Sequence, residues 1–243
     1  MISIGSVKLG TRPRIVVPLL DTEVRTDGPR AKELADIFEL RIDLFQRHEP
    51  SYAAQLCEAA RAANVPLIAT VRSPEEGGGG DLDDDQRLRL FAAALPYVDV
   101  LDIEHRTAIR DRVIDLAHGS RKQVIVSHHD FERTPPVRDL VAIVDESKAA
   151  GADIVKLATA AQSFADVERL FGVLLSQRSK RLVAISLGPY GTVSRVVFPL
   201  FGSLLTYGFL HQANAPGQLS LSELDAEFRR YDPEFGKCSS RAR

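Results

Sequence analysis

The sequence predicts a (β/α)8 barrel, and three observations lead to this fold class. Short apolar or β-branched runs alternate along the chain with longer segments of helical periodicity, which is typical of βαβ units around a parallel sheet. Eight such runs fall within 243 residues, which is the size and rhythm of this barrel. No linker or shift in composition divides the chain, so we expect one barrel domain over residues 1–243.

The eight expected strands follow one another from one end of the chain to the other. Each is a short run of apolar residues of the kind that a buried parallel strand requires. They are IVVPLL at 15–20, IFELRI at 37–42, PLIATV at 66–71, VDVLDIE at 98–104, QVIVSHH at 123–129, DIVKLA at 153–158, LVAISL at 182–187 and TYGFL at 206–210. The residues before the first strand are expected to form a small hairpin that closes the bottom of the barrel.

Helices are expected between these strands, where apolar residues recur at three- and four-residue spacing opposite a polar face. The clearest such segments are 51–64, 83–95, 106–119, 137–151 and 163–177. Asp81 and Ser163 are predicted helix N-caps, and Gly119 and Gly151 are predicted left-handed C-caps. The glycine-rich EEGGGGD at 75–81 is predicted to be a loop after the third strand.

Composition and charge favour small-molecule chemistry. The net charge is -2 and there is no long basic run, which gives no support for nucleic-acid binding. Cys57 and Cys238 are far apart and indicate neither a disulfide framework nor a zinc site. No signal peptide is recognisable, and the uncharged run 196–210 is too short and too broken by proline and glycine to span a bilayer. We therefore expect a cytoplasmic protein with no membrane partner.

Charged residues interrupt several of the expected strands, and strand alternation predicts which way they point. In DIVKLA, Lys156 lies opposite Val155 and Leu157, and the face that contacts the helices must be apolar. Lys156 is therefore expected to point into the barrel, from the carboxyl end of its strand, where barrel enzymes place their active sites. By the same argument the other inward residues are Glu39, Arg41, Asp102, Glu104, Ser127 and His129.

Each of these residues alone also has a structural explanation. Lys156 could extend along its stem to solvent, and His129 could be a satisfied core residue. Glu39 and Arg41 could form a buried salt bridge. The convergence of polar residues from four strands on one end of the barrel is what favours an active site.

Arg195 provides an independent indication of a ligand. It is the only formally charged residue between positions 182 and 210, so it has no partner near it in the sequence. A guanidinium that faces a pocket without a partner indicates an anionic ligand, and a carboxylate is its natural bidentate match. The alternative is that Arg195 lies in solvent at the start of a helix.

These residue types together are suited to Schiff-base chemistry. A lysine attacks a carbonyl only when neutral, and at a pKa of about 10.4 fewer than about one in a thousand are neutral at pH 7. Apolar neighbours and a cation such as Arg41 are expected to lower the lysine pKa by about three units. The resulting iminium would acidify the adjacent carbon, with His129 as the proton carrier and Glu104 holding the tautomer of that histidine.

Seven motifs, in order, carry a resemblance to a known family. They are ELRID, TVRSPEEGG, LDIE, SHHDFERTP, DIVKLA, ISLGPYGTVSR and APGQL. With these motifs the chain resembles the type I 3-dehydroquinate dehydratases, Schiff-base enzymes of the shikimate pathway, from IVVPLL to APGQLS. The resemblance implies a (β/α)8 barrel that is a homodimer, needs no metal or cofactor, and converts 3-dehydroquinate to 3-dehydroshikimate.

The resemblance also implies roles for individual residues. Lys156 would form the imine with the substrate ketone, while His129 would take the proton from the adjacent carbon and return one to the departing hydroxyl. Glu76 in RSPEEGG resembles the loop glutamate of the family, which contacts the substrate and helps proton movement. The residues expected to bind the substrate are Glu39, Arg41, Arg72, Arg195, Asn214 and Gln218.

Three positions depart from the pattern of the family. Pro18 and Asn214 stand where many members have serine, and Leu187 stands where they have methionine. Leucine in place of methionine conserves volume and should have little effect. Pro18 and Asn214 are expected to affect substrate affinity. They are not expected to affect the reaction itself, because the residues of imine formation and proton transfer are intact.

Other classes of protein share part of this pattern of residues. A class I aldolase would also use a barrel lysine, but it would prefer a phosphate site near the last two strands, where Arg195 and APGQL fit a carboxylate better. A metal-dependent hydrolase could use His128 and His129 with Asp102 and Glu104, but adjacent histidines on a strand point to opposite faces. A barrel retained only for binding is disfavoured by the intact set of lysine, histidine and glutamate.

Overall fold

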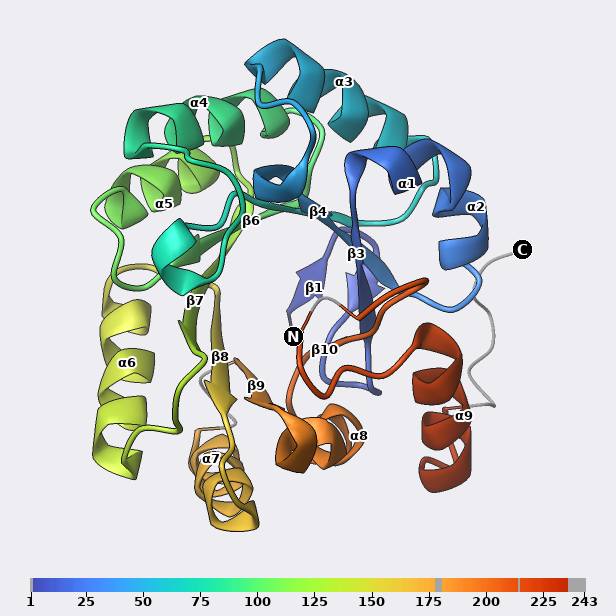
Figure 1. Cartoon of the computed structure of the whole chain (residues 1–243), viewed down its shortest axis with the longest axis vertical. Helices are drawn as coiled ribbons and strands as arrows, with labels where there is room; N and C mark the ends of the chain where they lie inside the picture. Colours follow the sequence, from blue (N-terminus) through green and yellow to red (C-terminus); the bar gives the residue numbers. More distant parts are fainter. Residues whose placement is uncertain (1, 178–180, 214, 236–243) are drawn as a thin grey trace.

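The computed structural model describes residues 2–177, 181–213 and 215–235. Its centre is an eight-stranded sheet in the order β10-β3-β4-β5-β6-β7-β8-β9, curled into a barrel and ringed by helices (Figure 1). The two ends of this order meet where the Leu204 N–H donates to the Leu182 carbonyl at 3.1 Å. The predicted (β/α)8 fold class is confirmed.

The strands are parallel and coincide closely with the predicted runs. Side chains on both of their faces are buried, one face under helices and the other inside the barrel, which explains the nearly continuous apolar sequence. Their bounds are β3 Ile15–Leu19, β4 Ile37–Arg41, β5 Leu67–Thr70, β6 Val100–Glu104, β7 Gln123–Asp130, β8 Ile154–Ala160, β9 Leu182–Leu187 and β10 Thr206–Tyr207.

The five predicted helices are present, with their ends shifted by a few residues, and further short helices complete the ring. The helix bounds are α1 Asp21–Thr26, α2 Gly28–Ala31, α3 Pro50–Arg61, α4 Asp84–Ala94, α5 Arg110–Gly119, α6 Val137–Ala149, α7 Phe164–Ser176, α8 Ser194–Leu200 and α9 Leu221–Tyr231. The 3₁₀ turns within the described residues include η1 Ile42–Leu44, η2 Pro74–Glu76 and η4 Pro189–Val193. In the part of the chain that the structure describes, no helix is long and apolar enough to cross a membrane.

Helix α8 has no clear amphipathic pattern because it is largely buried, which explains why it was not predicted. Helix α9, in contrast, begins with a capping box in which Ser220 accepts from the Glu223 N–H at 3.2 Å. That signal is present in the sequence, and the prediction of five helices did not use it.

Two of the predicted helix caps were wrong. Asp83, not Asp81, caps α4, because its carboxylate accepts the Gln86 N–H at 2.8 Å in a complete capping box. Gly119 is still helical, and the left-handed conformation falls on Arg121 with φ of 58°. The chain turns there because it must reverse direction just before β7 begins, and Gly119 lies too early for that turn.

The interior of the barrel is apolar at its lower end and becomes polar toward the carboxyl ends of the strands. The lower layer consists of Val16, Ile37, Ile68, Val100, Ile125, Ile154 and Val183. Two residues further along four of these strands come Glu39, Thr70, Asp102 and Lys156, all buried. Side-chain alternation therefore places this polar layer directly above the apolar one.

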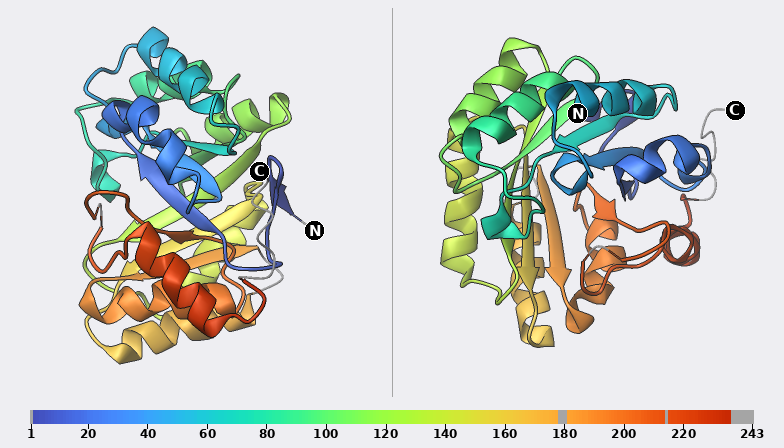
Figure 2. Two further views of the ribbon diagram at one scale, coloured as in Figure 1. Left: turned by 90° about the vertical axis from the view of Figure 1, so that its right-hand side faces the viewer. Right: turned by 45° about the horizontal axis from the view of Figure 1, so that its top comes forward.

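An N-terminal hairpin of β1 Ser3–Ile4 and β2 Val7–Lys8 covers the lower end of the barrel, as predicted. Ile4 is fully buried and packs with the apolar interior layer. At the turn, Gly5 has φ of 52°, and a Cβ there would lie 3.0 Å from Pro66, just before β5. Figure 2 shows this hairpin lying across one end of the barrel, which leaves the opposite end for the site.

Candidate active site

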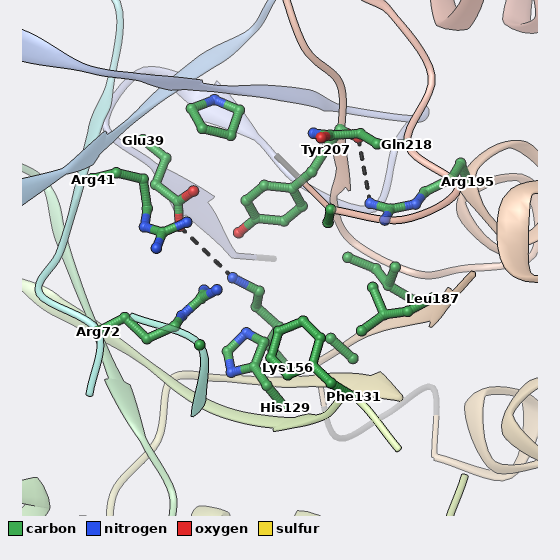
Figure 3. A pocket seen from close by; sticks show the side chains of 15 residues that line it. Glu39, Arg41, Arg72, His129, Phe131, Lys156, Leu187, Arg195, Tyr207 and Gln218 are labelled. Carbon is green, nitrogen blue, oxygen red and sulfur yellow. Dashed lines mark hydrogen bonds and ion pairs between the residues drawn. The ribbon is translucent and has the colours of Figure 1, made fainter. Parts of the chain in front are cut away.

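A pocket opens at the carboxyl ends of the strands (Figure 3). Most of the residues predicted for the site line it, although Glu76 and Glu104 are not among the lining residues and Asn214 lies outside the described residues. The lining residues are Pro18, Glu39, Arg41, Arg72, Gly77, His129, Phe131, Lys156, Ala158, Ile185, Leu187, Arg195, Tyr207, Ala215 and Gln218. Cationic and apolar side chains thus surround the same space.

Lys156 on β8 points into the barrel, as strand alternation predicted. Its Nζ donates to Asp102 Oδ2 at 3.0 Å and lies 3.7 Å from Glu39 Oε1. The ring of Tyr207 covers the same nitrogen, with 4.3 Å between Nζ and the ring centroid. Because Ser127 Oγ donates to Asp102 Oδ1 at 2.6 Å, the carboxylate that receives the lysine is itself held in place. The lysine tolerates burial because it is paired.

His129 on β7 presents one ring nitrogen to the pocket and the other to Glu76. Its Nδ1 lies 2.9 Å from Glu76 Oε2, which also accepts the His129 backbone N–H at 2.8 Å. The other nitrogen, Nε2, is buried and has no hydrogen-bond partner among the described residues. Burial, with Arg72 and Lys156 nearby, holds the pKa of His129 well below 6.5. The imidazole is therefore neutral at pH 7, with Nε2 able to accept a proton.

The prediction that Glu104 orients His129 was wrong. Glu104 instead accepts the Ser73 N–H at 2.7 Å and forms a buried ion pair with Arg87. It therefore anchors the turn η2, and that turn carries the carboxylate of Glu76 to His129. Alternation along β6 predicted that Glu104 points inward, but it could not show that Arg87 would reach it from α4.

Glu39 and Arg41 do not form the buried salt bridge that was one explanation for them. Glu39 accepts from Thr70 Oγ1 at 2.9 Å, and Arg41 binds Asp43 through Nε at 3.0 Å and Nη2 at 2.7 Å. Asp43 also accepts the Gly79 N–H at 3.1 Å, so it holds the glycine-rich loop against the barrel. Both Glu39 and Arg41 remain in the pocket wall, and Arg41 is fixed in its orientation.

Arg195 lies near the start of α8, where it is 2% exposed, so the alternative of a solvated helix start was wrong. Its Nε and Nη2 are buried and have no hydrogen-bond partner among the described residues. Nη1 lies 3.5 Å from the Tyr207 carbonyl oxygen. Burial lowers the pKa of Arg195 to about 10, so the group is still charged at pH 7. A buried cation with two unused donors is suited to bind an anion.

Comparison with known proteins decides the family. A model of the type I 3-dehydroquinase family matches residues 15–230. The chain belongs to the type I 3-dehydroquinase family. It is 37% identical over 227 residues to 3-dehydroquinate dehydratase of Methanococcoides burtonii, an alignment that covers 92% of this chain and 97% of that protein.

Solved structures of type I 3-dehydroquinases and related dehydratases have the same fold. The 3-dehydroquinate dehydratase of Aquifex aeolicus matches with a TM-score of 0.80 and 34% identity, over 90% of this chain and 99% of that one. The type I enzyme of Clostridium difficile, solved with covalently modified comenic acid, matches with a TM-score of 0.87 and 28% identity, over 95% and 97% of the two chains. The family expected from the motifs is confirmed.

The remaining described residues singled out from the type I 3-dehydroquinase motifs line the same pocket. Arg72 and Gln218 line the pocket, and Nε of Arg72 is buried with no hydrogen-bond partner among the described residues. Pro18 and Leu187, two of the departures from the family pattern, also line the pocket. These two departures therefore change the shape and polarity of the pocket wall.

Sequence reasoning missed the contribution of Tyr207, and it gave Asp102 a role only in the metal-dependent hydrolase alternative. Alternation did predict that Asp102 points inward, on the same side of the sheet as Lys156, but not that the two side chains meet. Tyr207 lies on β10, a strand of only two residues, where alternation has too few positions to be informative. Its place beside the lysine depends on the pairing of β10 with β3.

Proposed function

We propose that this type I 3-dehydroquinase removes water from 3-dehydroquinate to give 3-dehydroshikimate, through a Schiff base on Lys156 with His129 as acid and base. One observation carries the proposal. The amine of Lys156, the Nε2 of His129 and the Nε and Nη2 of Arg195 belong to residues that line the same pocket, and these histidine and arginine nitrogens have no hydrogen-bond partner among the described residues. A ketone, an acidic carbon and a carboxylate on one small ring would each find a partner there.

Imine formation begins with Lys156. Its ammonium proton must leave before Nζ can attack, and Asp102 Oδ2 at 3.0 Å is placed to accept that proton. The nitrogen then adds to the ketone carbon to give a carbinolamine. The proton that Asp102 accepted is then returned to the carbinolamine hydroxyl, which leaves as water while the carbon–nitrogen double bond of the iminium forms.

Elimination then proceeds from the iminium. His129 Nε2 takes a proton from the carbon next to the iminium carbon, and the electron pair moves into the iminium to give an enamine. The enamine expels the hydroxyl on the following carbon, which leaves as water with the proton from His129. Hydrolysis of the new iminium frees Lys156, so the net change is the loss of one water. Each step uses a side chain of this protein, and the proposal needs no metal or cofactor.

The function is tested directly by adding 3-dehydroquinate to the purified protein. The product is a conjugated enone, so its formation should appear as rising ultraviolet absorbance. An otherwise folded protein that produces no absorbance change at any substrate concentration would contradict the proposal.

Arg195 should supply much of the affinity for the substrate carboxylate. Arg195→Ala should weaken substrate binding by about 2–4 kcal/mol, because the carboxylate would lose two charge-assisted hydrogen bonds in a buried site. Steady-state kinetics measures the change. Arg138→Ala, which removes an exposed arginine of α6, is the matched control and should behave like the wild type. Unchanged KM and kcat in folded Arg195→Ala would contradict this role.

Activity should fall as the pH is lowered through about 7. Burial raises the pKa of Glu76 to about 7, against the opposing effect of the His129 N–H, so this carboxylate takes up a proton as the pH falls through that value. A protonated Glu76 is a weaker acceptor for Nδ1 of His129, which then loses the partner that holds its tautomer. A profile of kcat/KM from about pH 5 to pH 9 should show this acid limb.

The variant Glu76→Gln identifies the group that titrates. Its amide oxygen can still accept from Nδ1 of His129 but does not ionise, so the acid limb near pH 7 should disappear. Retention of the same limb in Glu76→Gln would assign it to another group.

We also propose that two copies of the chain form a homodimer, as the family resemblance implies. Exposed aromatic side chains on α7, on η4 and directly after α8 support this proposal. Phe164 is 67% exposed and lies 5.3 Å from the ring of Tyr190, and Phe201, 47% exposed, lies 5.3 Å from the ring of Phe171. Apolar surface of this kind favours contact with another protein. Light scattering should give about twice 26.7 kDa.

A cytoplasmic location stays a prediction.

A further inference from the structure

The hydroxyl of Tyr207 is a buried polar group without a hydrogen-bond partner among the described residues. Tyrosine hydroxyls that are removed from water usually find a partner, because leaving one without a hydrogen bond destabilises the folded protein. Such a group in a native structure therefore requires an explanation. Tyr207 lines the active-site pocket, which suggests that its partner is something that enters the pocket.

The surroundings of the Tyr207 ring indicate where a hydrogen-bond partner of its hydroxyl would lie. The ring covers Lys156 Nζ with 4.3 Å between the nitrogen and the ring centroid. Figure 3 shows the hydroxyl end of the ring directed into the middle of the pocket, between Arg41 and Lys156. Because the hydroxyl end of the ring is directed toward the side of the pocket where Lys156 lies, a ligand joined to Nζ would bring the atoms near its bonded carbon close to this hydroxyl.

Charges around the pocket determine which kind of partner the hydroxyl would accept. Burial raises the pKa of Tyr207 well above 10, and the nearby carboxylates of Glu39 and Asp102 act in the same direction. Tyr207 therefore keeps its proton throughout the neutral range and is available as a neutral donor. The backbone carbonyl oxygen of Tyr207 lies 3.5 Å from Nη1 of Arg195. The strand that carries Tyr207 is therefore in contact with the residue proposed to bind the substrate carboxylate.

We propose that the Tyr207 hydroxyl is a specificity-determining group that donates a hydrogen bond to a hydroxyl oxygen of the substrate, close to the carbon joined to Lys156. This inference rests on the proposed function and deepens it. The ligand class is a cyclic keto acid that carries a hydroxyl near its ketone. A keto acid without that hydroxyl would leave the Tyr207 hydroxyl unsatisfied and would bind less tightly.

The alternative is that the hydroxyl supports the fold, and the two roles make opposite predictions for Tyr207→Phe. Without ligand, this variant loses only an unsatisfied polar atom, so its unfolding temperature should stay the same or rise. A structural hydroxyl would instead lower that temperature when removed. With ligand, the variant loses a hydrogen bond that the wild type makes.

The experiment compares wild type and Tyr207→Phe in steady-state kinetics with 3-dehydroquinate and in thermal unfolding with and without 3-dehydroshikimate. We expect KM to rise about 10-fold with kcat within about threefold, and the stabilisation by the product to shrink. Tyr231→Phe, which removes an exposed hydroxyl on α9, is the matched control and should match the wild type. An unchanged KM in Tyr207→Phe, whatever its unfolding temperature, would overturn the inference.

Failure of the proposed function itself has a different signature in the same experiment. A wild-type protein that forms no enone and gains no stability from the product would contradict the function, and this inference with it. An active wild type beside an equally active Tyr207→Phe would contradict the role of Tyr207 alone.

Discussion

Sodium borohydride, added to the protein together with 3-dehydroquinate, should abolish activity and leave the reduced ligand attached to Lys156. The imine between Nζ and the substrate carbon accepts hydride and a proton to become a secondary amine, which water cannot hydrolyse. Lys156 has the required access, because its Nζ lines the pocket while its stem is packed in the barrel. Neither reagent alone should inactivate the enzyme irreversibly.

Mass spectrometry of the digested protein locates the label. It should be found on the peptide that contains Lys156. Lys148 serves as the internal control, because its Nζ donates to the carbonyls of Ala152 and Asp153 at the outer layer of the barrel. Labelling of Lys148 at a level equal to that of Lys156 would show non-specific reductive modification, not a catalytic imine.

Lys156→Ala should lose the label and lower turnover by at least about 10⁴-fold, as expected when the nucleophile of a covalent mechanism is removed. Because this change also leaves the carboxylates of Asp102 and Glu39 without their cation, Lys156→Met, which keeps most of the side-chain volume, should be measured beside it. If substrate and borohydride leave the wild type active and unlabelled, Lys156 is a structural charge partner and the Schiff-base mechanism is wrong.

His129→Ala should lower turnover by about 10²–10⁴-fold and should accumulate a covalent adduct. The amine of Lys156 and its partner Asp102 are untouched in this variant, so the imine can still form. The proton on the neighbouring carbon then has no acceptor, because Nε2 of His129 is the unpartnered base in the described wall of the pocket. Intact-protein mass spectrometry with substrate should therefore show the adduct.

His128→Ala is the matched control for this prediction. The two histidines are adjacent on β7, but alternation directs His128 to the opposite face, and it does not line the pocket. His128→Ala should form product at a rate close to that of the wild type. A normal rate in His129→Ala, or a loss of chemistry in a folded His128→Ala, would exchange the roles assigned to the two residues.

Helix α4 and turn η2 illustrate where prediction from the sequence reached its limit. The sequence placed a helix and a loop there correctly, and the resemblance selected Glu76 as a functional carboxylate. Neither the sequence pattern nor the resemblance showed that Nδ1 of His129 is held by Glu76 and that Glu104 is not its partner. That choice depends on Arg87, which reaches Glu104 from α4 and leaves Glu76 to meet the histidine.

The sequence by itself determined the parallel strands, the inward direction of Lys156 and His129, and the end of the barrel at which they lie. These properties follow from local periodicity, because a strand alternates its side chains whatever surrounds it. Tertiary structure alone decided the partners. These are Asp102 for Lys156 and Asp43 for Arg41, while the hydroxyl of Tyr207 has no partner in the described part of the chain. Partners depend on strand register, on how neighbouring side chains compete, and on the closing of the barrel, and these bring together residues that are far apart along the chain.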